Sequence, residues 1–419
     1  MIPTDPDTRT ILDRCDELAT YSASPTGIDR RYLTPQHAAV NALVAGWLEQ
    51  AGLLRTWQDA AGNQWGRLEG FRPGLPALVL GSHLDSVPDA GRYDGILGVT
   101  VAVQIAERLR SNRLPFALEV VAFGDEEGSR FGATLLGSRA VAGSWDAAWW
   151  ELVDEDGLSL ADAFTAFGLD PARVGEAARS RESIVGYLEP HIEQGPLLEE
   201  ADRSLAVVSG IAGATRALVT LEGEARHCAT PYAARRDAML GACEQILAVD
   251  EIARAAGCYV TMGHLAVEPD AVNVVAGQVT YSIDLRSPDD DLRATTWARL
   301  CERIEELAAA RRLGVSVQVT HSARATTVDP RLAQLVRAGI QATGDADPMM
   351  LPSIAGHDTM AMADLCEVAM LFVRCGGGIS HHPDESVRAQ DVAAAVTALE
   401  RTVLDLAEDH QTDAIRDTA

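Results

Sequence analysis

The sequence predicts an α/β protein: a large domain with a mixed, mostly parallel sheet covered by helices, interrupted by an inserted α+β domain with an open sheet and two helices. Near both ends of the chain, short apolar runs alternate with patterns of helical spacing, whereas the middle has a succession of short strand patterns. The length of 419 residues suits two or three domains. A hydrophobic content of 47% and a charged content of 23% are those of a globular chain, so wholesale disorder is excluded.

Strand and helix patterns that begin the large domain return near its end. Buried strands are predicted at 77–80, 118–123 and 368–373, and helices at 95–110 and 392–406. This order indicates parallel strands whose connecting helices cover the sheet. Residues 150–182 are acidic and interrupted by glycine and proline, and we expect them to form a helical excursion from this domain.

The middle of the chain has the order strand, helix, two strands, helix, strand, which is typical of a small α+β domain. Its strands are predicted within 205–221, 259–265, 278–285 and 315–320, and its helices at 236–256 and 288–313. The second helix is expected to have Ser287 as its N-cap, Pro288 in its first turn and Gly314 after its end. We therefore predict the inserted domain at 213–324 and the large domain at 1–212 and 325–419.

The composition excludes several classes of function. All 35 basic residues are arginines, which excludes mechanisms that need a lysine amine, such as Schiff-base aldolases, PLP enzymes and P-loop or kinase phosphoryl transfer. The formal net charge of −26 makes nucleic acid and anionic membranes poor partners.

The cysteines and the apolar segments predict a cytoplasmic protein. The seven cysteines include no CxxC pair, which argues against a disulfide framework and against a cysteine-ligated zinc site. The N-terminal segment carries acids where a signal peptide has basic residues, and no apolar run reaches the roughly 18 residues of a membrane span.

The first segment that carries chemistry, GSHLDSVP, follows directly on a predicted strand, and ligands of α/β sheets collect at the carboxyl ends of strands. His83 and Asp85 are two residues apart on an extended chain, so they face the same side and suit a metal-ligating imidazole with an orienting carboxylate. Asp94 precedes the next predicted helix. The alternative is a histidine bonded within a loop and an aspartate that caps the helix.

The second segment, GDEEGSRF, places two adjacent carboxylates at the end of another predicted strand. Their mutual repulsion requires compensation by a cation or a proton. One carboxylate of the pair Glu126 and Glu127 can bind a metal while the other, pointing elsewhere, abstracts a proton. A solvated acidic turn is the alternative, which the apolar strand leading into the pair disfavours.

Two further segments, EPHIEQGP and GGISHHPDE, contribute more histidines and acids, the second again after an apolar strand. Together the four segments supply five candidate metal ligands, none of them a thiolate: His83, Asp94, Glu127, His191 and His381. This set fits one or two divalent ions of the Zn, Mn, Co or Ni type. A carboxylate such as Asp94 can bridge two ions about 3.5–4 Å apart, the spacing of binuclear hydrolases.

Taken in order along the chain, these motifs resemble those of the M20-type metallohydrolases, in the hydantoinase/carbamoylase amidase branch. That branch contains allantoate amidohydrolases, N-carbamoyl-amino-acid hydrolases and β-ureidopropionases. The resemblance covers nearly the whole chain, through the segments GSHLDSVPDAGRYDG, GDEEGSRF, EPHIEQGP, AVNVVAGQVTYSIDLRSPD, AGHDTMAMA and GGISHHPDE. The histidine of EPHIEQGP is typical of the ureido-cleaving branch, whereas peptidase members generally carry a carboxylate at that position.

The resemblance implies two ions per subunit and a role for each matching residue. The metal ligands would be His83, Asp94, Glu127, His191 and His381, with Asp94 as the bridge. Glu126 would be the general base, and Asp85 would orient His83. The substrate-binding residues would be Gln194, Arg216, Asn273, Arg286, Gly356 and His357. Arg216, Asn273 and Arg286 would hold a substrate carboxylate, which suits the planar, permanently charged guanidinium; without the resemblance, the two arginines would be interpreted as surface ion-pair residues.

The inserted domain of this family serves as a lid and joins two subunits, so the resemblance also implies a homodimer. His227 would reach the neighbouring subunit's site and steady the developing oxyanion. The sequence departs from the family pattern here, because the stretch from His227 to Pro231 is one residue shorter, which bears on the reach of His227. In the last motif, His382 replaces a small polar residue and is a competing ligand, although His381 is the residue that matches.

These features predict a metal-dependent amidohydrolase that releases ammonia and carbon dioxide from a terminal ureido group. Such a carbonyl is a poor electrophile, so hydrolysis requires an activated water and a polarised oxygen. Allantoate is the favoured substrate, because the segment MLFVRCGGG resembles that of allantoate enzymes. The alternatives are an N-carbamoyl-L-amino-acid hydrolase or β-ureidopropionase, an M20 peptidase or deacylase, which would require an acid at position 191, and a catalytically silent binding subunit, which would lack the base or a ligand.

Overall fold

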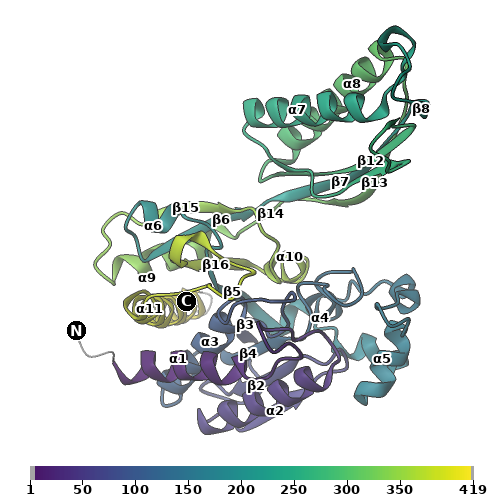
Figure 1. Ribbon diagram of the computed structural model, residues 1–419. Helices are drawn as coiled ribbons and strands as arrows, with labels where there is room; N and C mark the ends of the chain where they lie inside the picture. Colours follow the sequence, from purple (N-terminus) through teal and green to yellow (C-terminus); the bar gives the residue numbers. More distant parts are fainter. Residues whose placement is uncertain (1–4, 417–419) are drawn as a thin grey trace. The chain divides into compact units, whose positions relative to one another are not determined.

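The structure is a computed structural model that describes residues 5–416 (Figure 1). It divides into two compact units. Unit 1 comprises the chain up to residue 209, residues 327–351 and the chain from residue 356 onward, and unit 2 comprises residues 210–326 and 352–355. The division into an inserted domain at 213–324 and a large domain at 1–212 and 325–419 stays a prediction.

The larger sheet has nine strands in the order β1-β2-β4-β3-β5-β16-β6-β14, with β15 paired to β6. The strands are β1 (Arg55–Gln58), β2 (Gln64–Leu68), β3 (Ala77–His83), β4 (Ala117–Phe123), β5 (Ile184–Ile192), β6 (Leu205–Ile211), β14 (Thr326–Thr327), β15 (Met349–Ser353) and β16 (Val368–Val373). The four central strands β4, β3, β5 and β16 run parallel, while β2 and β6 lie antiparallel to their inner neighbours. The predicted mixed sheet is confirmed, with its parallel strands at the centre.

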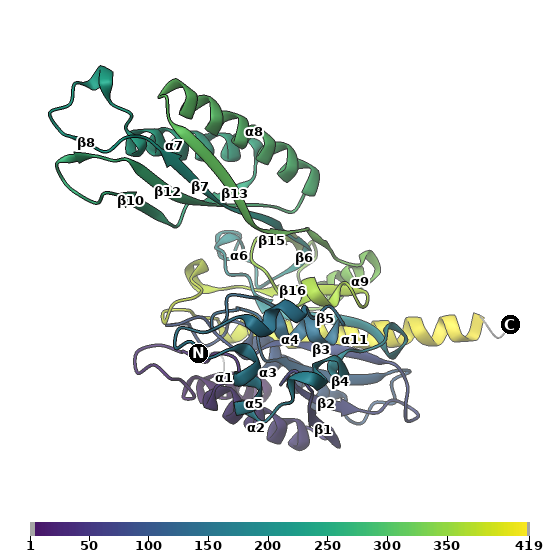
Figure 2. The same cartoon turned by 90° about the vertical axis from the view of Figure 1, so that its right-hand side faces the viewer.

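Helices cover both faces of this sheet, which explains why β3, β4 and β16 are buried along their whole length. One face packs against α1 (Pro6–Ala19), α2 (Pro35–Gln50), α3 (Ile96–Leu109), α9 (Pro330–Gln341) and α11 (Ala389–Arg416). The other face packs against α4 (Leu136–Val141) and α10 (Thr359–Met362), and α6 (Leu197–Glu200) follows β5. In Figure 2, the C-terminal end of α11 extends past the other elements of unit 1.

The segment predicted as a helical excursion contains mostly short helical turns. Its elements are η1 (Ala147–Glu151), α5 (Leu160–Phe167), η2 (Pro171–Ala177) and η3 (Arg181–Ser183). Gly168 ends α5 in the left-handed conformation, and Pro171 begins the next turn. The aromatic side chains of Trp145, Trp150 and Phe164 pack together and anchor the segment.

Unit 2 contains an antiparallel sheet in the order β10-β12-β7-β13, with β9 also paired to β12, and a two-stranded sheet of β8 and β11. Its elements are β7 (Gly213–Glu222), β8 (Arg226–His227), η4 (Tyr232–Ala234), α7 (Ala238–Ala256), β9 (Tyr259–Thr261), β10 (Leu265–Glu268), β11 (Val274–Val275), β12 (Gln278–Ser287), α8 (Asp290–Ala310) and β13 (Gly314–Ala323). Both helices lie on the same side of the larger of these sheets (Figure 1). The predicted open sheet with two helices is confirmed.

Strict alternation along β12 gives the sheet of unit 2 one apolar and one polar face. Its buried side chains are Val279, Tyr281, Ile283 and Leu285, which pack under the two helices. The side chains between them point to the opposite face and are Thr280, Ser282, Asp284 and Arg286. The polar face therefore stays available for contacts other than helix packing.

Four local predictions for the inserted domain are wrong. The N-cap of α8 is Asp289, whose side chain accepts hydrogen bonds from two backbone amides of the first turn, while Ser287 is still part of β12 and pairs with Gly213. Pro288 precedes this N-cap and is therefore not in the first turn of the helix. Gly314 does not end the helix, because it already begins β13. The single strand expected at 259–265 is two strands, β9 and β10, and both pair with β12.

No helix within residues 5–416 is both long and apolar enough to cross a membrane.

A buried ion pair joins the end of β16 to the start of α11. Nε and Nη2 of Arg374 donate to Oδ2 and Oδ1 of Asp391 at 2.7 and 2.8 Å, and 2% and 0% of the two side chains are exposed. Because Arg374 directly follows β16, the pair also fixes the start of the segment that leads to His381.

Replacing Arg374 with Ala is expected to lower the free energy of unfolding by about 3–5 kcal/mol, because the Asp391 carboxylate would be left buried without its cation. Urea unfolding followed by circular dichroism measures the change. The exposed pair of Arg254 and Asp250 on α7 provides the control, and Arg254→Ala is expected to cost less than about 1 kcal/mol. Equal effects of the two substitutions would contradict the prediction.

Candidate metal centre

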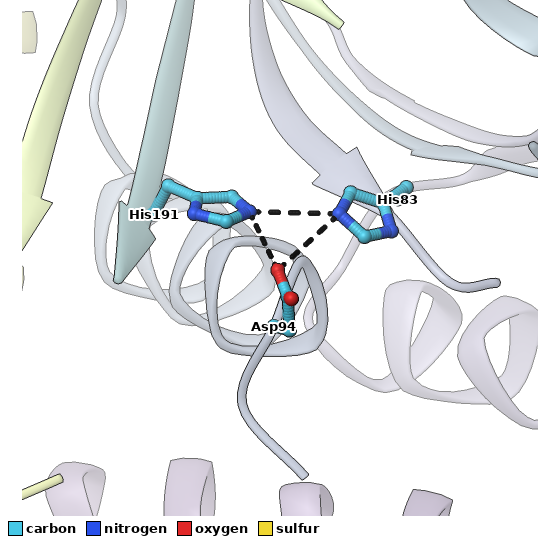
Figure 3. Close-up of side chains that lie close together, drawn as sticks. All are labelled: His83, Asp94 and His191. Carbon is cyan, nitrogen blue, oxygen red and sulfur yellow. Dashed lines mark hydrogen bonds and ion pairs between the residues drawn. The ribbon is translucent and has the colours of Figure 1, made fainter. Parts of the chain in front are cut away.

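Two histidines and one aspartate meet at the carboxyl ends of β3 and β5 (Figure 3). His83 is the last residue of β3, His191 lies near the end of β5, and Asp94 lies two residues before the start of α3. Oδ1 of Asp94 lies 3.1 Å from Nε2 of His191 and 3.7 Å from Nε2 of His83, and the two Nε2 atoms are 3.5 Å apart. All three side chains are buried, so the edge of the parallel sheet holds a compact set of donor atoms.

Asp94 does not cap α3, which excludes the alternative interpretation of this residue. The N-cap is Gly95, which has a φ of 67° and no side chain that could accept a hydrogen bond. A Cβ atom at this position would lie 2.5 Å from the ring of His83, so the close approach of the chain to the imidazole requires glycine. The carboxylate of Asp94 is thereby available for the histidines.

A second group of donors shares Asp94 with the first. Nε2 of His381 lies 3.0 Å from Oδ2 of Asp94 and 3.3 Å from Oε1 of Glu127. Asp94 therefore presents one carboxylate oxygen to each group, which is the arrangement that a bridging ligand needs. The competing candidate His382 is exposed, and its Nδ1 lies 3.6 Å from Asp384, so it belongs to neither group.

Asp85 connects the first histidine to the acidic pair. Nδ1 of His83 lies 3.4 Å from Oδ1 of Asp85, and the two oxygens of Asp85 accept hydrogen bonds from the backbone amides of Glu126 and Glu127 at 2.9 and 3.1 Å. One buried carboxylate thus fixes both the imidazole of β3 and the turn that follows β4. The sequence predicts only that Asp85 orients His83, whereas in the structure Asp85 also binds the backbone amides of Glu126 and Glu127.

The histidines of the centre are drawn toward their charged forms. Burial opposes protonation of His83, but the hydrogen bond and charge of Asp85 raise its pKa well above the usual value. For His191, burial is likewise outweighed by the bond to Asp94, which raises its pKa. Hydrogen bonds to Asp94 and a second acid raise the pKa of His381 to about 10. The nearby carboxylates therefore favour the protonated, positively charged form of these imidazole rings.

The carboxylates respond in opposite ways to the same environment. Burial would raise the pKa of Asp94, but hydrogen bonds to His191 and His381 hold it well below the usual value. Glu126 has no such bonds to imidazole, and burial together with the charge of Glu127 raises its pKa well above the usual value. A carboxylate with raised proton affinity beside an ionised one is suited to proton transfer.

The donor set fits divalent ions. The three groups of ligand atoms are His83, Asp94 and His191; His83, Glu126 and Glu127; and Asp94, Glu127 and His381, with all atoms of a group within 4.8 Å of one another. Imidazole nitrogen and carboxylate oxygen without thiolate suit Zn, Mn, Co or Ni. A cation there would replace the protons that the histidines otherwise supply against the buried acids.

Three of the predicted substrate-binding residues lie beside this centre. Gln194 donates from Nε2 to Oδ2 of Asp94 at 3.0 Å, and the ring of His357 lies 4.4 Å from that of His191. A Cβ atom on Gly356 would lie 3.4 Å from Oε1 of Glu126. Gln194 and His381 both adopt the left-handed backbone conformation, with φ of 57° and 55°, which non-glycine residues keep only where surrounding contacts enforce it.

The predicted arginines lie together on the polar face of unit 2. Arg216 and Arg286 both donate to Asp284, with Nε of Arg216 and Nη2 of Arg286 at 3.1 and 3.0 Å from Oδ2, and Nη1 of Arg286 donates to the carbonyl of Ile354 at 2.8 Å. Burial would raise the pKa of Asp284, but Arg286, with Arg216, lowers it. All of these residues line a pocket of about 640 Å³ within unit 2.

His227 and Asn273 are brought together elsewhere in unit 2, in the small sheet of β8 and β11. His227 is exposed and pairs with Val274, and the amide of Cys228 donates to the carbonyl of Asn273 at 3.0 Å. The shortened stretch after His227 forms a turn in which Nδ1 of His227 accepts the amide of Ala229 at 3.2 Å. His227 and Asn273 thus lie with each other, and the two arginines lie with Asp284.

Asp284 and the polar residues around His381 were not among the residues predicted from the sequence. Asp284 stands two residues before Arg286 on a predicted strand, so their side chains point to the same face, and this spacing could have indicated the pair. Ser380 and Glu385 are part of the segment GGISHHPDE, yet their contact with Asp94 joins positions nearly 300 residues apart in the chain and leaves no local pattern.

Comparisons with known proteins agree with this geometry. Residues 79–405 match the peptidase family M20/M25/M40. The chain is 38% identical to an allantoate deiminase of Arabidopsis thaliana, over 92% of this chain and 80% of that protein. It is 37% identical to an N-carbamoyl-L-amino acid amidohydrolase of Geobacillus stearothermophilus, over 95% of this chain and 98% of that protein. A crystal structure of an amidase of the hydantoinase/carbamoylase family from Burkholderia multivorans superposes with a TM-score of 0.87 at 30% identity and covers 97% of this chain and 98% of that one. The chain is therefore a hydrolase of peptidase family M20/M25/M40, in its hydantoinase/carbamoylase amidase branch.

Proposed function

We propose that the protein is a metal-dependent amidohydrolase that cleaves the carbon–nitrogen bond of a terminal ureido group, with allantoate as its substrate. The observation that carries the proposal is the pair of donor groups that share Asp94 beside the buried Glu126. The named relatives support the ureido chemistry, because allantoate and N-carbamoyl amino acids both carry this group. The reaction consumes water and releases ammonia and carbon dioxide, leaving the amine.

Two divalent ions per subunit, drawn from Mn, Zn, Co and Ni, would be held by the two groups. The first would be held by His83, Asp94 and His191, and the second by Asp94, Glu127 and His381. When bound, such ions supply Lewis acidity toward the ureido oxygen and lower the pKa of water. The chain's own residues set the number and place of the donors.

Glu126 carries the proton transfers in the proposed reaction. Its carboxylate takes a proton from the attacking water as the oxygen bonds to the ureido carbon, and it returns the proton to the nitrogen whose bond to that carbon breaks. Asp85 keeps the amides of residues 126 and 127 in place during these steps. His227, supplied by a second copy of the chain, steadies the negative charge on the ureido oxygen.

The polar pocket of unit 2 supports allantoate over the alternatives. We assign Arg216 and Arg286 to the substrate carboxylate, because a guanidinium binds a carboxylate through two parallel hydrogen bonds. Asn273, which lies with His227 elsewhere in unit 2, is assigned to the same carboxylate as a residue supplied, like His227, by a second copy of the chain. The wall of the pocket near the arginines carries the hydroxyls of Thr261, Ser282 and Thr320. These hydroxyls can form hydrogen bonds with the second ureido group of allantoate, a group that N-carbamoyl amino acids with apolar side chains lack.

An N-carbamoyl-L-amino-acid hydrolase, or a β-ureidopropionase, is the second candidate. It is favoured by the Geobacillus stearothermophilus relative, which aligns over 98% of its own length. The catalytic groups would be the same, so the wall of the pocket decides between the two substrates.

The protein is further proposed to act as a cytoplasmic homodimer through unit 2, without nucleic acid or membrane partners. The net charge of −26 supports the absence of polyanionic partners.

A panel of substrates tests the proposed specificity. Metal-loaded protein is incubated with allantoate, N-carbamoyl-β-alanine and several N-carbamoyl-L-amino acids, and ammonia release gives kcat/KM for each. We expect allantoate to exceed the others by about 10-fold or more, the discrimination that matched hydrogen-bonding groups provide. A higher kcat/KM for an N-carbamoyl amino acid would favour the second candidate, and no turnover of any ureido compound would refute the proposal.

Substitutions of Glu126 and Glu127 test the proposed general base and the proposed metal ligand side by side. Glu126→Gln is expected to keep two ions per subunit while kcat falls by roughly 100- to 10,000-fold, since the proton acceptor is lost. Glu127→Gln is expected to lower the metal content measured by elemental analysis, because one donor of the second group is lost. A Glu126→Gln enzyme that retains its kcat would remove Glu126 from the role of base.

The arginines can be tested through the charge of the substrate. Arg286→Ala is expected to lower kcat/KM for allantoate by about 10- to 150-fold, since a hydrogen bond to a charged group contributes about 1.5–3 kcal/mol. The exposed Arg299 on α8 provides the control, because Arg299→Ala also removes one positive charge from unit 2. Loss of discrimination between allantoate and its methyl ester should accompany the Arg286 substitution only, and equal losses in both variants would contradict the assignment.

A further inference from the structure

Glu385 is a buried acid that lies against the shared aspartate. It follows His381 by four residues, and only 4% of the residue is exposed. Oε1 of Glu385 accepts hydrogen bonds from the backbone amides of Tyr93 and Asp94 at 2.7 and 3.1 Å. These two amides donate to one buried carboxylate, so the main chain at Asp94 is fixed by a residue nearly 300 positions away in the sequence.

The second oxygen of Glu385 reaches the carboxylate of Asp94 through Ser380. Oγ of Ser380 lies 2.9 Å from Oε2 of Glu385 and 3.0 Å from Oδ2 of Asp94. Glu385 therefore holds the amide of Asp94 directly, and Ser380 lies between the two carboxylates, where its single hydroxyl hydrogen can be donated to either of them. Because Ser380 directly precedes His381, the same contacts tie together two of the three donors of the second group, Asp94 and His381.

The backbone segment that passes next to Glu385 leaves room for its side chain at Gly91. A Cβ atom on Gly91 would lie 2.3 Å from Cβ of Glu385 and 2.5 Å from its Oε1, so this approach is possible only with glycine. The segment from Gly91 to Asp94 thus passes directly over the Glu385 carboxylate.

We propose that Glu385 is a positioning residue that turns one oxygen of Asp94 toward each donor group, and so sets the affinity for the ion held by Asp94, Glu127 and His381. The ion held by His83 and His191 depends less on Glu385, because Nδ1 of each histidine lies within hydrogen-bond distance of a backbone carbonyl, that of Asp85 at 3.1 Å and that of Ile192 at 2.9 Å. This inference rests on the metal-dependent function proposed above.

Titration of the metal-free, full-length protein with Mn²⁺ alone tests the proposal. Calorimetry of the wild type should show two ions per subunit. Glu385→Ala should bind the first ion as the wild type does and the second about 10- to 100-fold more weakly, the usual effect of losing a residue that orients a ligand. Electron paramagnetic resonance with two equivalents of Mn²⁺ should show a coupled pair in the wild type and isolated Mn²⁺ in Glu385→Ala, a readout that destabilisation alone would not move.

Conservative variants separate position from charge. The carbonyl of Glu385→Gln can accept the same two amides and its amide can donate to Ser380, so the second ion should bind within about threefold of the wild-type affinity. Ser380→Ala removes only the link to the carboxylate and should weaken the second ion less than Glu385→Ala does. Glu119→Gln, at a buried carboxylate that bonds Arg67 and Arg179 instead, is the matched control and should bind both ions normally.

The outcomes distinguish this proposal from the proposed function. A wild type that binds no Mn²⁺ would refute both. A wild type with two ions and a Glu385→Ala protein that binds the second equally tightly would overturn the positioning role alone, as would a Glu385→Gln protein as defective as Glu385→Ala. If Glu385→Ala does not fold, Gly91→Ala, whose methyl group displaces Glu385, and Ser380→Ala decide, and unchanged second-ion binding in both overturns the proposal.

Discussion

The burial of several carboxylates at one edge of the parallel sheet is the constraint on which the rest of this structure depends. Asp85, Asp94 and Glu126 are 1%, 4% and 8% exposed, and an ionised carboxylate that loses its water must be compensated by hydrogen bonds or positive charge. Asp85 is compensated by two amides, and Asp94 by imidazoles. The histidines meet this demand when they take up protons, and a divalent ion would supply the same positive charge in place of those protons.

The fold makes this concentration of charge possible because it separates packing from chemistry. The central strands are buried on both faces mainly by apolar side chains, and most polar residues of the site lie in the loops beyond the strand ends, with His83 and His191 near the ends of β3 and β5. Since β3, β4, β5 and β16 are parallel, residues from four distant parts of the sequence converge there. In unit 2, apolar packing and polar groups are separated by the two faces of one antiparallel sheet. The helices cover one face, and the other face is polar.

The sequence predicted the parts of the fold that depend on local periodicity. The strand expected at 368–373 coincides with β16, and the helix expected at 95–110 is α3 shortened by one residue at each end. The N-cap of α8 was assigned wrongly, because Ser287 and Asp289 are both good caps and the choice between them is made by the pairing of Ser287 with Gly213 on β7. Pairing across a sheet is tertiary information that no window of sequence contains.

The candidate site shows the same division between what local patterns reveal and what they omit. Donors that directly follow an apolar strand, such as His83 and the pair Glu126 and Glu127, could be found from the sequence because strand ends are local features. The link from Glu385 through Ser380 to Asp94 could not, since it depends on how far-separated loops meet. The placement of His227 in the two-stranded sheet with β11 likewise depends on pairing that its shortened motif does not encode.

The charge balance of the polar pocket bears on the substrate. Arg216, Arg286 and Asp284 together carry a formal net charge of +1, which in the proposed function would match one substrate carboxylate rather than two. Asp284 holds both guanidiniums in place through hydrogen bonds, which would reduce the entropy lost when a carboxylate binds. A monoanionic ureido acid such as allantoate would therefore suit these three residues better than a dianion. The arginines, which alone would be interpreted as a surface ion pair, would thus act in substrate binding because of the aspartate between them.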